Sequence, residues 1–248
     1  MIKMNKIIVL TGTIDVSYGN ANVAVSNLNE RLNQYLQNIE RFILKSDFDI
    51  IIFAENSNYG YNYLPLNKLA KKHNKKLEIL SFMGSNDIIK IFGKGFGEGE
   101  ILKYAVENSE YLKDNDVEFY KITGRIFVKN INKILKQSTA KNIFIKWDIR
   151  KNQIDSRFFK TQVGFFKKYV MPAMHITDER TALSIEEVYY SELRGNKEIK
   201  SFKSYPLITG ICASLGKPYD LNFFKLQYRR LQLFFGALDV ATKGLKSK

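Results

Sequence analysis

The sequence contains few of the residues from which disulfides and metal centres are built. Its 248 residues include one cysteine, Cys212, and two histidines, His73 and His175. A single cysteine excludes an internal disulfide and a cysteine-rich zinc site, and it fits a reducing compartment. Two histidines argue against a metal site built from several imidazoles. His175 has no triad partner near it in the sequence, so we expect it to be structural.

Long apolar segments are also absent. The basic start of the chain is followed by an apolar run over residues 7–10 only, which is too short for the core of a signal peptide. No stretch reaches the length of a membrane-spanning helix. The chain lacks a Gly-x-Ser-x-Gly nucleophile elbow as well, which disfavours a serine hydrolase. We therefore expect a cytoplasmic protein of another class.

Positive charge is abundant: the formal net charge is +14, and 45% of the residues are hydrophobic. The apolar fraction predicts a folded core. The charge predicts an anionic partner, such as a phosphorylated ligand, an anionic lipid or nucleic acid. A nucleic-acid-binding protein is one alternative. However, the basic residues are spread along the whole chain, and no nucleic-acid-binding motif is present, so we expect no nucleic acid partner.

The first 147 residues alternate between two kinds of hydrophobic pattern. Continuous apolar runs are typical of strands buried on both faces, and apolar residues at helical spacing predict amphipathic helices. The predicted strands cover residues 6–10, 49–54, 77–82, 117–122 and 142–147, and the predicted helices cover residues 23–44, 64–72, 101–112 and 126–135. This order predicts an α/β fold with a mostly parallel central sheet and helices on both faces.

The pattern changes after residue 150. Residues 158–171 are aromatic and basic, and a helix is predicted over residues 184–193, with Ser184 and Glu187 forming a capping box. A turn-rich loop follows over residues 206–216, and an aromatic and basic terminal helix over residues 222–245. Without a linker or repeat, the chain reads as one domain, residues 1–248. We divide it into a nucleotide-sugar-binding half (1–150), an acceptor and catalytic half (151–221) and a terminal helix (222–248).

The glycine-rich stretch over residues 93–100 matches neither a dinucleotide fingerprint nor a Walker A loop. It follows the third strand instead of the first, and no Gly-Lys-Ser/Thr follows it. We predict a loop that caps the next helix. An alternative is a backbone that approaches a ligand closely, with Glu98 or Glu100 near an acceptor.

Polar and glycine residues follow the predicted strands. In a parallel sheet these positions meet at one edge, where ligands bind. Lys121 stands at the end of a buried strand and Arg125 just past a glycine. A buried lysine is costly unless it meets an anion. Lys121 is therefore interpreted either as a partner of a diphosphate group or as one half of a strand-end salt bridge.

Four carboxylates between residues 148 and 187 are candidates for chemistry. Asp148 and Asp155 follow the fifth predicted strand and could hold a metal, bind a sugar or cap a helix. Glu186 and Glu187 lie on a short helix beside Tyr189 and Tyr190. A glutamate among aromatic rings can have a raised pKa and act as a base, although glutamates on helices are more often ordinary surface residues.

Together these segments resemble bacterial glycosyltransferases of capsule, lipooligosaccharide and O-antigen clusters, including galactofuranosyltransferases. The similarity runs from about residue 7 to about residue 225. The motifs are specific in combination, and each is weak alone. They are Thr11-Gly12-Thr13, Arg31, Glu55-Asn56-Ser57, Gly95-Phe96-Gly97-Glu98-Gly99-Glu100, Tyr120-Lys121-Ile122-Thr123-Gly124-Arg125, Asp155-Ser156-Arg157-Phe158-Phe159 and Ile185-Glu186-Glu187-Val188-Tyr189-Tyr190.

The resemblance implies a GT-A-like fold and a nucleotide-diphosphate sugar donor, with a UDP-sugar favoured. Among the acidic residues we choose Glu186 as the catalytic base, with Asp155 as the second choice. Acceptor binding is assigned to Glu98, Glu100 and Glu187. Donor binding is assigned to Thr11, Gly12, Thr13, Arg31, Glu55, Asn56, Lys121, Thr123 and Arg125.

The sequence departs from the family at one position. Many GT-A enzymes bind a divalent metal through an Asp-x-Asp pair after the fourth strand, where this chain has Lys121-Ile122-Thr123. A charged lysine cannot bind a metal. Basic residues could replace the metal, which we favour, or Mn²⁺ or Mg²⁺ could be held by Asp148 or Asp155. We therefore assign no certain cofactor.

The expected reaction is sugar transfer to a glycan or lipid-linked glycan in cell-surface polysaccharide synthesis. The aromatic and basic terminal helix suits an anionic membrane surface, and it equally suits packing on the domain. Nucleotidyl- or methyltransfer on a related sheet is an alternative. A methyltransferase would, however, need a glycine-rich loop after the first strand, where only Gly12 is present.

Overall fold

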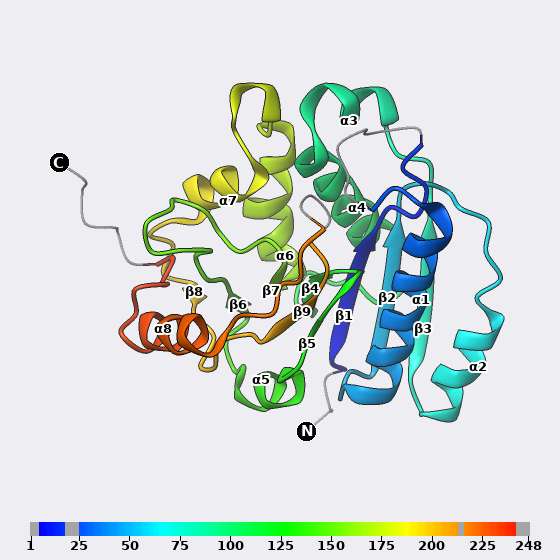
Figure 1. Ribbon diagram of the computed structural model, residues 1–248, viewed down its shortest axis with the longest axis horizontal. Helices are drawn as coiled ribbons and strands as arrows, with labels where there is room; N and C mark the ends of the chain where they lie inside the picture. Colours follow the sequence, from blue (N-terminus) through cyan, green and yellow to red (C-terminus); the bar gives the residue numbers. More distant parts are fainter. Residues whose placement is uncertain (1–4, 18–24, 213–215, 242–248) are drawn as a thin grey trace.

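A seven-stranded sheet forms the centre of the protein (Figure 1). The computed structural model describes residues 5–17, 25–212 and 216–241. The strands lie in the order β3-β2-β1-β4-β7-β6-β8. Their bounds are β1 Ile7–Gly12, β2 Ile50–Glu55, β3 Lys76–Ser81, β4 Glu118–Thr123, β6 Asn142–Ile143, β7 Phe158–Gln162 and β8 Ile199–Lys200.

The sheet is mostly parallel. Strands β3, β2, β1 and β4 run in one direction, and β6 is parallel to β8. Only β7 runs against both of its neighbours, β4 and β6. The predicted α/β class and the mostly parallel sheet are therefore confirmed. A second sheet pairs β5 (Ile126–Val128) with β9 (Ile208–Gly210) in antiparallel fashion.

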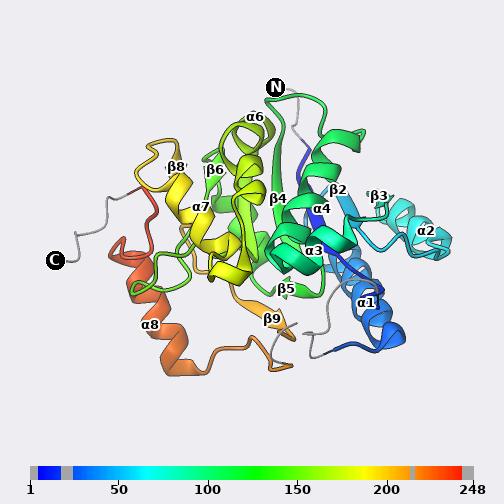
Figure 2. The same cartoon turned by 90° about the horizontal axis from the view of Figure 1, so that it is seen from above.

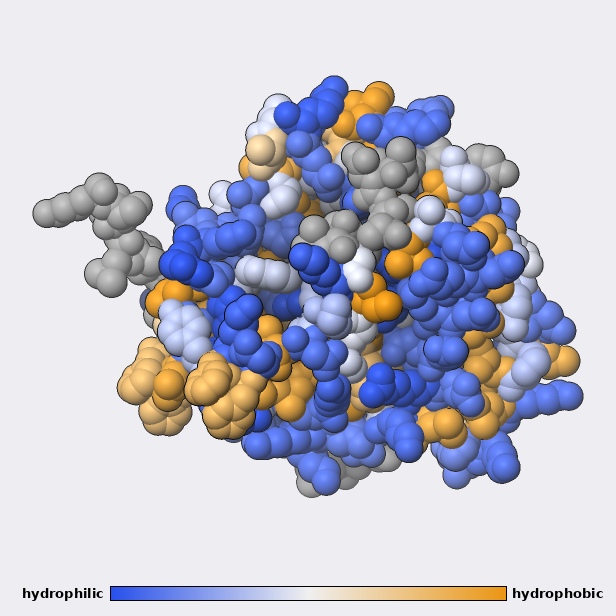
Figure 3. Space-filling model, viewed as in Figure 1, coloured by the Kyte–Doolittle hydropathy of each residue, from blue (hydrophilic) through white to orange (hydrophobic). Residues whose placement is uncertain are grey.

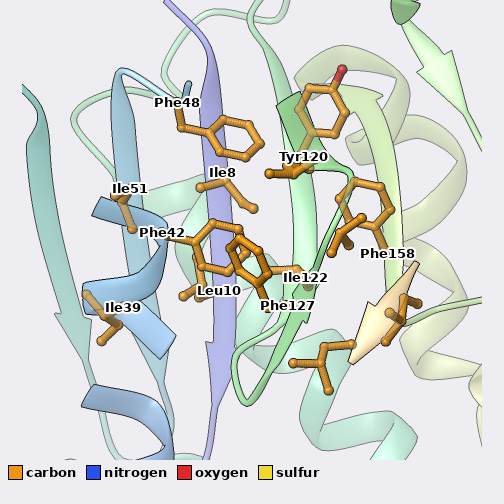
Figure 4. Packing of buried hydrophobic residues seen from close by; sticks show 14 of the residues in the cluster. Ile8, Leu10, Ile39, Phe42, Phe48, Ile51, Tyr120, Ile122, Phe127 and Phe158 are labelled. Atoms are coloured by element: carbon orange, nitrogen blue, oxygen red, sulfur yellow. The ribbon is translucent and has the colours of Figure 1, made fainter. Parts of the chain in front are cut away.

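Alternate residues of the central strands feed two separate hydrophobic cores. Ile8 and Leu10 of β1 point to one face, while Ile7 and Val9 point to the other, as the two-residue period of a strand requires. Both sets are buried, because helices cover both faces (Figure 2). Figure 4 shows the first core, in which Phe42 of α1 meets Phe127 of β5 at a ring distance of 4.8 Å.

The helices divide between the two faces of the sheet. Helix α1 (Leu28–Lys45) and the β5–β9 sheet cover the first core, and α4 (Lys94–Asn108) and α7 (Ile185–Leu193) cover the second. The remaining elements are α2 Leu64–Lys72, α3 Asn86–Phe92, α5 Ile131–Gln137, α6 Val163–Phe165, a π-helical turn at Phe166–Val170, 3₁₀ turns at Met171–His175 and Glu179–Thr181, and α8 Phe223–Phe234.

The glycine-rich stretch is helical, so its prediction as a loop is wrong. Helix α4 starts at Lys94 and includes all three of the glycines at positions 95, 97 and 99. A Cβ on Gly99 would lie 2.4 Å from the Cβ of Met174, and one on Gly95 would lie 2.9 Å from the Cβ of Ile185. The glycines therefore let α4 approach its neighbours closely, and this packing outweighs their low helix propensity.

Several predicted boundaries in the rest of the chain need correction. Residues 126–135 contain strand β5 before helix α5, and the fifth predicted strand shortens to β6, with single bridges at Ile145 and Lys146. The predicted loop over residues 206–216 contains β9. The first helix begins at Leu28 after the cap Asn27, and the terminal helix ends at Phe234. Residues 18–24, 213–215 and 242–248 lie outside the described part.

Candidate functional site

The carboxyl ends of β1, β2 and β4 border a cleft of about 850 Å³, part of which is open to solvent. Ligands bind at this edge of a parallel sheet. The cleft contains many of the residues assigned from the sequence, which come from separate segments of the chain. It is lined by Thr11, Gly12, Thr13, Asp15, Val16, Arg31, Tyr35, Asn56, Asn86, Ile89, Lys94, Gly97, Glu98, Ile101, Thr123 and Arg125.

The loop after β1 forms one wall of the cleft. Gly12 has no room for a side chain, because a Cβ there would lie 2.8 Å from the ring of Phe53 and 2.9 Å from that of Tyr35. The Thr13 hydroxyl donates a 2.6 Å hydrogen bond to Oδ1 of Asn56. This bond joins the loop after β1 to the loop after β2.

Arg31 supports that wall from helix α1. Its side chain is buried and donates hydrogen bonds to the backbone oxygens of Thr13 at 3.0 Å, Ile14 at 3.1 Å and Val25 at 3.0 Å. Burial lowers the pKa of Arg31, and the charge of Arg125 adds to this effect. No carboxylate in the described part of the chain forms a salt bridge with Arg31, although the charge of Asp15, which also lines the cleft, acts on it from a distance.

Arg125 lies on the same side of the cleft. Its guanidinium carbon lies 5.9 Å from the ring centre of Tyr35, and Nη1 donates a 2.9 Å hydrogen bond to Oε1 of Gln34. This partner is also neutral. The preceding Gly124 is required, because a Cβ there would lie 2.7 Å from the backbone oxygen of Thr11. Two arginines that form no salt bridge within the described residues therefore line one cleft, and guanidinium groups bind phosphate well.

A buried ammonium lies behind the cleft at the end of β4. Lys121 is 0% exposed and forms an ion pair with Glu98 of α4. Its Nζ also donates to the backbone oxygen of Ser156 at 2.6 Å and to Oγ1 of Thr123 at 3.3 Å. The salt bridge at the strand end, one of the two interpretations of Lys121, is what the structure contains. Thr123 and Glu98 line the cleft, and Lys121 lies beneath them.

Glu186 belongs to the same cluster. It lies at the start of α7, where Ser156 Oγ donates a 2.8 Å hydrogen bond to its Oε1. Burial raises the pKa of Glu186, and the charge of Glu98 contributes to the rise. The hydrogen bond from Ser156 and the charge of Lys121 act in the opposite direction. A carboxylate with a raised pKa beside a cleft is suited to accepting a proton.

Three other glutamates assigned from the sequence have their carboxylates occupied by local contacts. Glu55 is buried and accepts hydrogen bonds from the backbone and hydroxyl of Ser57 at 2.8 and 2.6 Å. Glu100 accepts from the backbone nitrogen of Ser85 at 3.0 Å. Glu187 completes the capping box predicted with Ser184. None of the three lines the cleft in the part of the chain that the structure describes.

Asp148 and Asp155 are each held by arginine. Arg157 binds Asp155 through Nε at 2.8 Å and Nη2 at 2.7 Å. Asp148 accepts from Arg229 at 2.9 Å. Burial tends to raise the pKa of Asp148, but hydrogen bonds from Arg150 and the charge of Arg229 lower it to about 2.

A divalent ion needs several oxygen ligands that are free to coordinate it. Among residues 5–17, 25–212 and 216–241, no group of three or more Asp, Glu, His or Cys side chains could hold a metal ion. The contacts of Asp148 and Asp155 with arginine also leave these carboxylates poorly suited to the task. With both carboxylates engaged by arginines, Asp148 and Asp155 do not provide the free oxygen ligands of the Mn²⁺ or Mg²⁺ site considered from the sequence.

Some residues of the cleft were not identified from the sequence. Tyr35 lies one turn after Arg31, and this four-residue spacing could have revealed it. Lys94 and Asn86 belong to helices that were predicted as a loop or missed. Ser156 belongs to one of the family motifs but was given no role, because its contact with Glu186 joins residues thirty positions apart in sequence.

The fold is shared with an enzyme of known structure. The glycosyltransferase GlyE from Streptococcus pneumoniae TIGR4 aligns with a TM-score of 0.53 and 8% identity, over 81% of this chain and 46% of its own. The chain thus spans about half the length of GlyE. At this identity the likeness shows the fold alone, and it confirms the predicted GT-A-like α/β architecture.

A second solved structure covers nearly the whole chain. It is described as a glucose-1-phosphate thymidylyltransferase from Bacillus anthracis in complex with a sucrose, and it aligns over 99% of this chain and 98% of its own, with a TM-score of 0.42 and 11% identity. No protein-family model and no curated protein matches the sequence. Within the described residues, no helix has the length and apolar character needed to span a bilayer.

Proposed function

We propose that this protein is a glycosyltransferase that takes a sugar from a nucleotide-diphosphate donor, with a UDP-sugar favoured. The acceptor would be a glycan or lipid-linked glycan of cell-surface polysaccharide synthesis. The observation that carries the proposal is the pair Arg31 and Arg125. Both residues line a cleft at the carboxyl edge of the sheet, and within the described residues both guanidinium groups donate hydrogen bonds to uncharged partners.

In this proposal the two arginines neutralise the diphosphate, as a metal ion would in many enzymes of this fold. Carbonyl oxygens orient Arg31 without cancelling its charge. The positive charges of the two arginines are therefore in place before the ligand arrives, and they would act on the charge that grows on the leaving diphosphate. Thr11, Thr13 and Asn56 would form the wall beside the nucleotide, and Thr123 the wall beside the sugar.

The reaction proposed is a displacement at the anomeric carbon. The acceptor oxygen forms a bond to that carbon while the bond to the diphosphate breaks and its electrons leave with the nucleotide. The acceptor proton passes to a carboxylate, for which we keep Glu186 as the first choice. Glu98 is the competing choice, because it lines the cleft while Glu186 does not. Lys121 would hold Glu98 in position.

Thermal-shift screening tests the ligand class. We expect UDP, or GDP or CMP if the donor carries another base, to raise the melting temperature, because a ligand that binds only the folded state stabilises it. S-adenosylmethionine and an oligonucleotide are the opposing ligands. Stabilisation by either of these alone would contradict sugar transfer. The next step is a screen for donor hydrolysis with UDP-sugars, which also names the sugar.

A further inference from the structure

Helix α8 carries a large apolar surface that faces solvent. Its aromatic side chains are among the most exposed in the protein: Phe223 is 67% exposed, Phe224 and Phe234 are each 81%, and Phe235 is 75%. Figure 3 shows the hydrophobic patch that they form over α8. Buried phenylalanines are the norm in folded proteins, and a contiguous exposed group of them marks an interaction surface.

The spacing of these residues follows the helix. With about 100° between successive residues, the exposed apolar positions fall within an arc of about 140° on one side of α8. The exposed stripe consists of Phe223, Phe224, Tyr228, Leu231, Phe234 and Phe235.

The opposite side of α8 accounts for its attachment to the domain. Leu226 and Leu233 pack against the first core, and Arg229 binds Asp148 at 2.9 Å. A helix that only packed on the domain would need one apolar face. The stripe is a second apolar face, and no residue of the described chain buries it.

Positive charges lie beside the stripe. A hollow of about 1270 Å³, open to solvent, is lined by Lys133, Lys203 and Arg230 together with Leu231 and Phe234 of the stripe. Helix α8 itself contains no acidic residue. Apolar and aromatic side chains flanked by cations are the features with which a helix lies in the interface of an anionic membrane.

We propose that the exposed stripe of α8 docks onto an anionic lipid surface, with Lys133, Lys203 and Arg230 contacting the phosphate headgroups. Charge complementarity favours lipid over a second copy of this chain, because two copies would bring two net charges of +14 together. In Figures 1 and 2, α8 lies on the opposite side of the molecule from α2 and β3, away from the carboxyl ends of β1 and β2, so docking leaves the cleft open. The proposal does not depend on sugar transfer.

Vesicle sedimentation with the full chain, without donor or acceptor, tests the docking. We expect binding to vesicles rich in phosphatidylglycerol and weak binding to phosphatidylcholine alone. The double variant Phe224→Ser/Phe235→Ser should lower the affinity about tenfold or more. Leu44→Ser/Leu64→Ser is the matched control, since these residues are also exposed (42% and 54%) but lie on α1 and α2. It should bind like the wild type.

A charge-reversal pair tests the headgroup contacts. Lys203→Glu/Arg230→Glu should lower the affinity for anionic vesicles by about tenfold or more. Lys71→Glu/Lys72→Glu changes the net charge equally on α2 and should have a much smaller effect. Equal loss in both variants would overturn the proposed contacts, leaving only a general charge effect.

Three further outcomes would overturn the docking proposal. The first is wild-type protein that binds neither kind of vesicle. The second is equal binding to both kinds, which would make the stripe a non-specific apolar surface. The third is a wild-type dimer that Phe224→Ser/Phe235→Ser converts to monomer, which would make the stripe a contact between two copies. The oligomeric state is measured by light scattering, and melting temperatures check that each variant is folded.

Discussion

Two groups of arginines receive different partners in this fold. At the cleft, Arg31 and Arg125 donate to backbone carbonyls and to the amide oxygen of Gln34. In the second half of the chain, Arg157 and Arg229 hold Asp155 and Asp148 in salt bridges. Among the described residues, the first group forms no salt bridge with a carboxylate, while the second group uses its charge in salt bridges that hold the structure together.

This difference in partners distinguishes arginines that can bind a ligand from arginines that stabilise the fold. A guanidinium held by neutral dipoles is oriented but still attracts an anion, and an ion pair attracts one much less. Arg125 and Arg157 both stand beside the ends of central strands. Residue type and position along the strand therefore do not tell these two arginines apart. The difference lies in their hydrogen-bond partners.

The largest expected effect tests whether the carboxylates at the cleft carry chemistry. Glu186→Gln keeps the shape of the side chain but removes the base, so we expect kcat to fall by roughly 10²–10⁴-fold. Glu192→Gln, on the exposed side of the same helix, is the control and should keep the wild-type rate. A Glu186→Gln enzyme with full activity would remove Glu186 from the role and leave Glu98 as the base.

The next prediction concerns the structural arginines. Arg157→Gln leaves the buried Asp155 carboxylate without its partner, so the free energy of unfolding should drop by about 3–5 kcal/mol. The pair Asp178 and Arg180 provides a matched control with nearly the same geometry, with Nη2 to Oδ2 distances of 2.7 Å in both pairs.

The control pair differs in its exposure to water. The side chain of Arg157 is 15% exposed and that of Arg180 is 58% exposed. Arg180→Gln should therefore leave the urea unfolding curve unchanged, because exposed ion pairs contribute little. Similar losses in both variants would mean that burial does not set the strength of these pairs.

The fold could be predicted well where local pattern and tertiary structure agree. Strands β1, β2 and β4 were found within one or two residues, because their apolar runs are buried on both faces. The glycines of α4 misled the prediction. The local sequence predicts a loop there. The glycines are instead required because α4 packs closely against Met174 and Ile185, which lie some eighty residues away in sequence.

The sequence predicts that the site lies at the carboxyl edge of the sheet, but it does not predict which charged side chains pair with one another there. Parallel strands bring Thr13, Asn56 and Thr123 to one cleft, which the order of the elements already implied. That Glu98 neutralises Lys121 depends on how α4 packs over β4, and the sequence around either residue contains no trace of it. For the same reason, the sequence does not predict that Arg125 has an uncharged partner while Arg157 has a carboxylate partner.

A smaller effect is expected for the cleft arginine. Arg125→Gln removes a charged donor, so binding of UDP should weaken by about 1.5–3 kcal/mol, or roughly ten- to a hundredfold in Kd. The melting temperature should change little, because the partner lost, Gln34, is neutral. Arg150→Gln is the control with the same loss of charge at an exposed position. Calorimetric titration in which both variants bind UDP equally would contradict the assignment of Arg125 to the diphosphate.

The smallest effect is expected in the pH dependence of the reaction. A base works only when ionised, so activity falls as the pH drops below its pKa, and the raised pKa of Glu186 moves this decline upward. The Ser156 hydroxyl stabilises the ionised form through its hydrogen bond, and Ser156→Ala should raise the pKa further. The acid limb of the kcat/KM profile should then shift to higher pH while the rate at alkaline pH stays the same. A uniform loss of rate at every pH would instead show that Ser156 only supports the packing around Lys121, and that the raised pKa of Glu186 is not the one that limits the reaction.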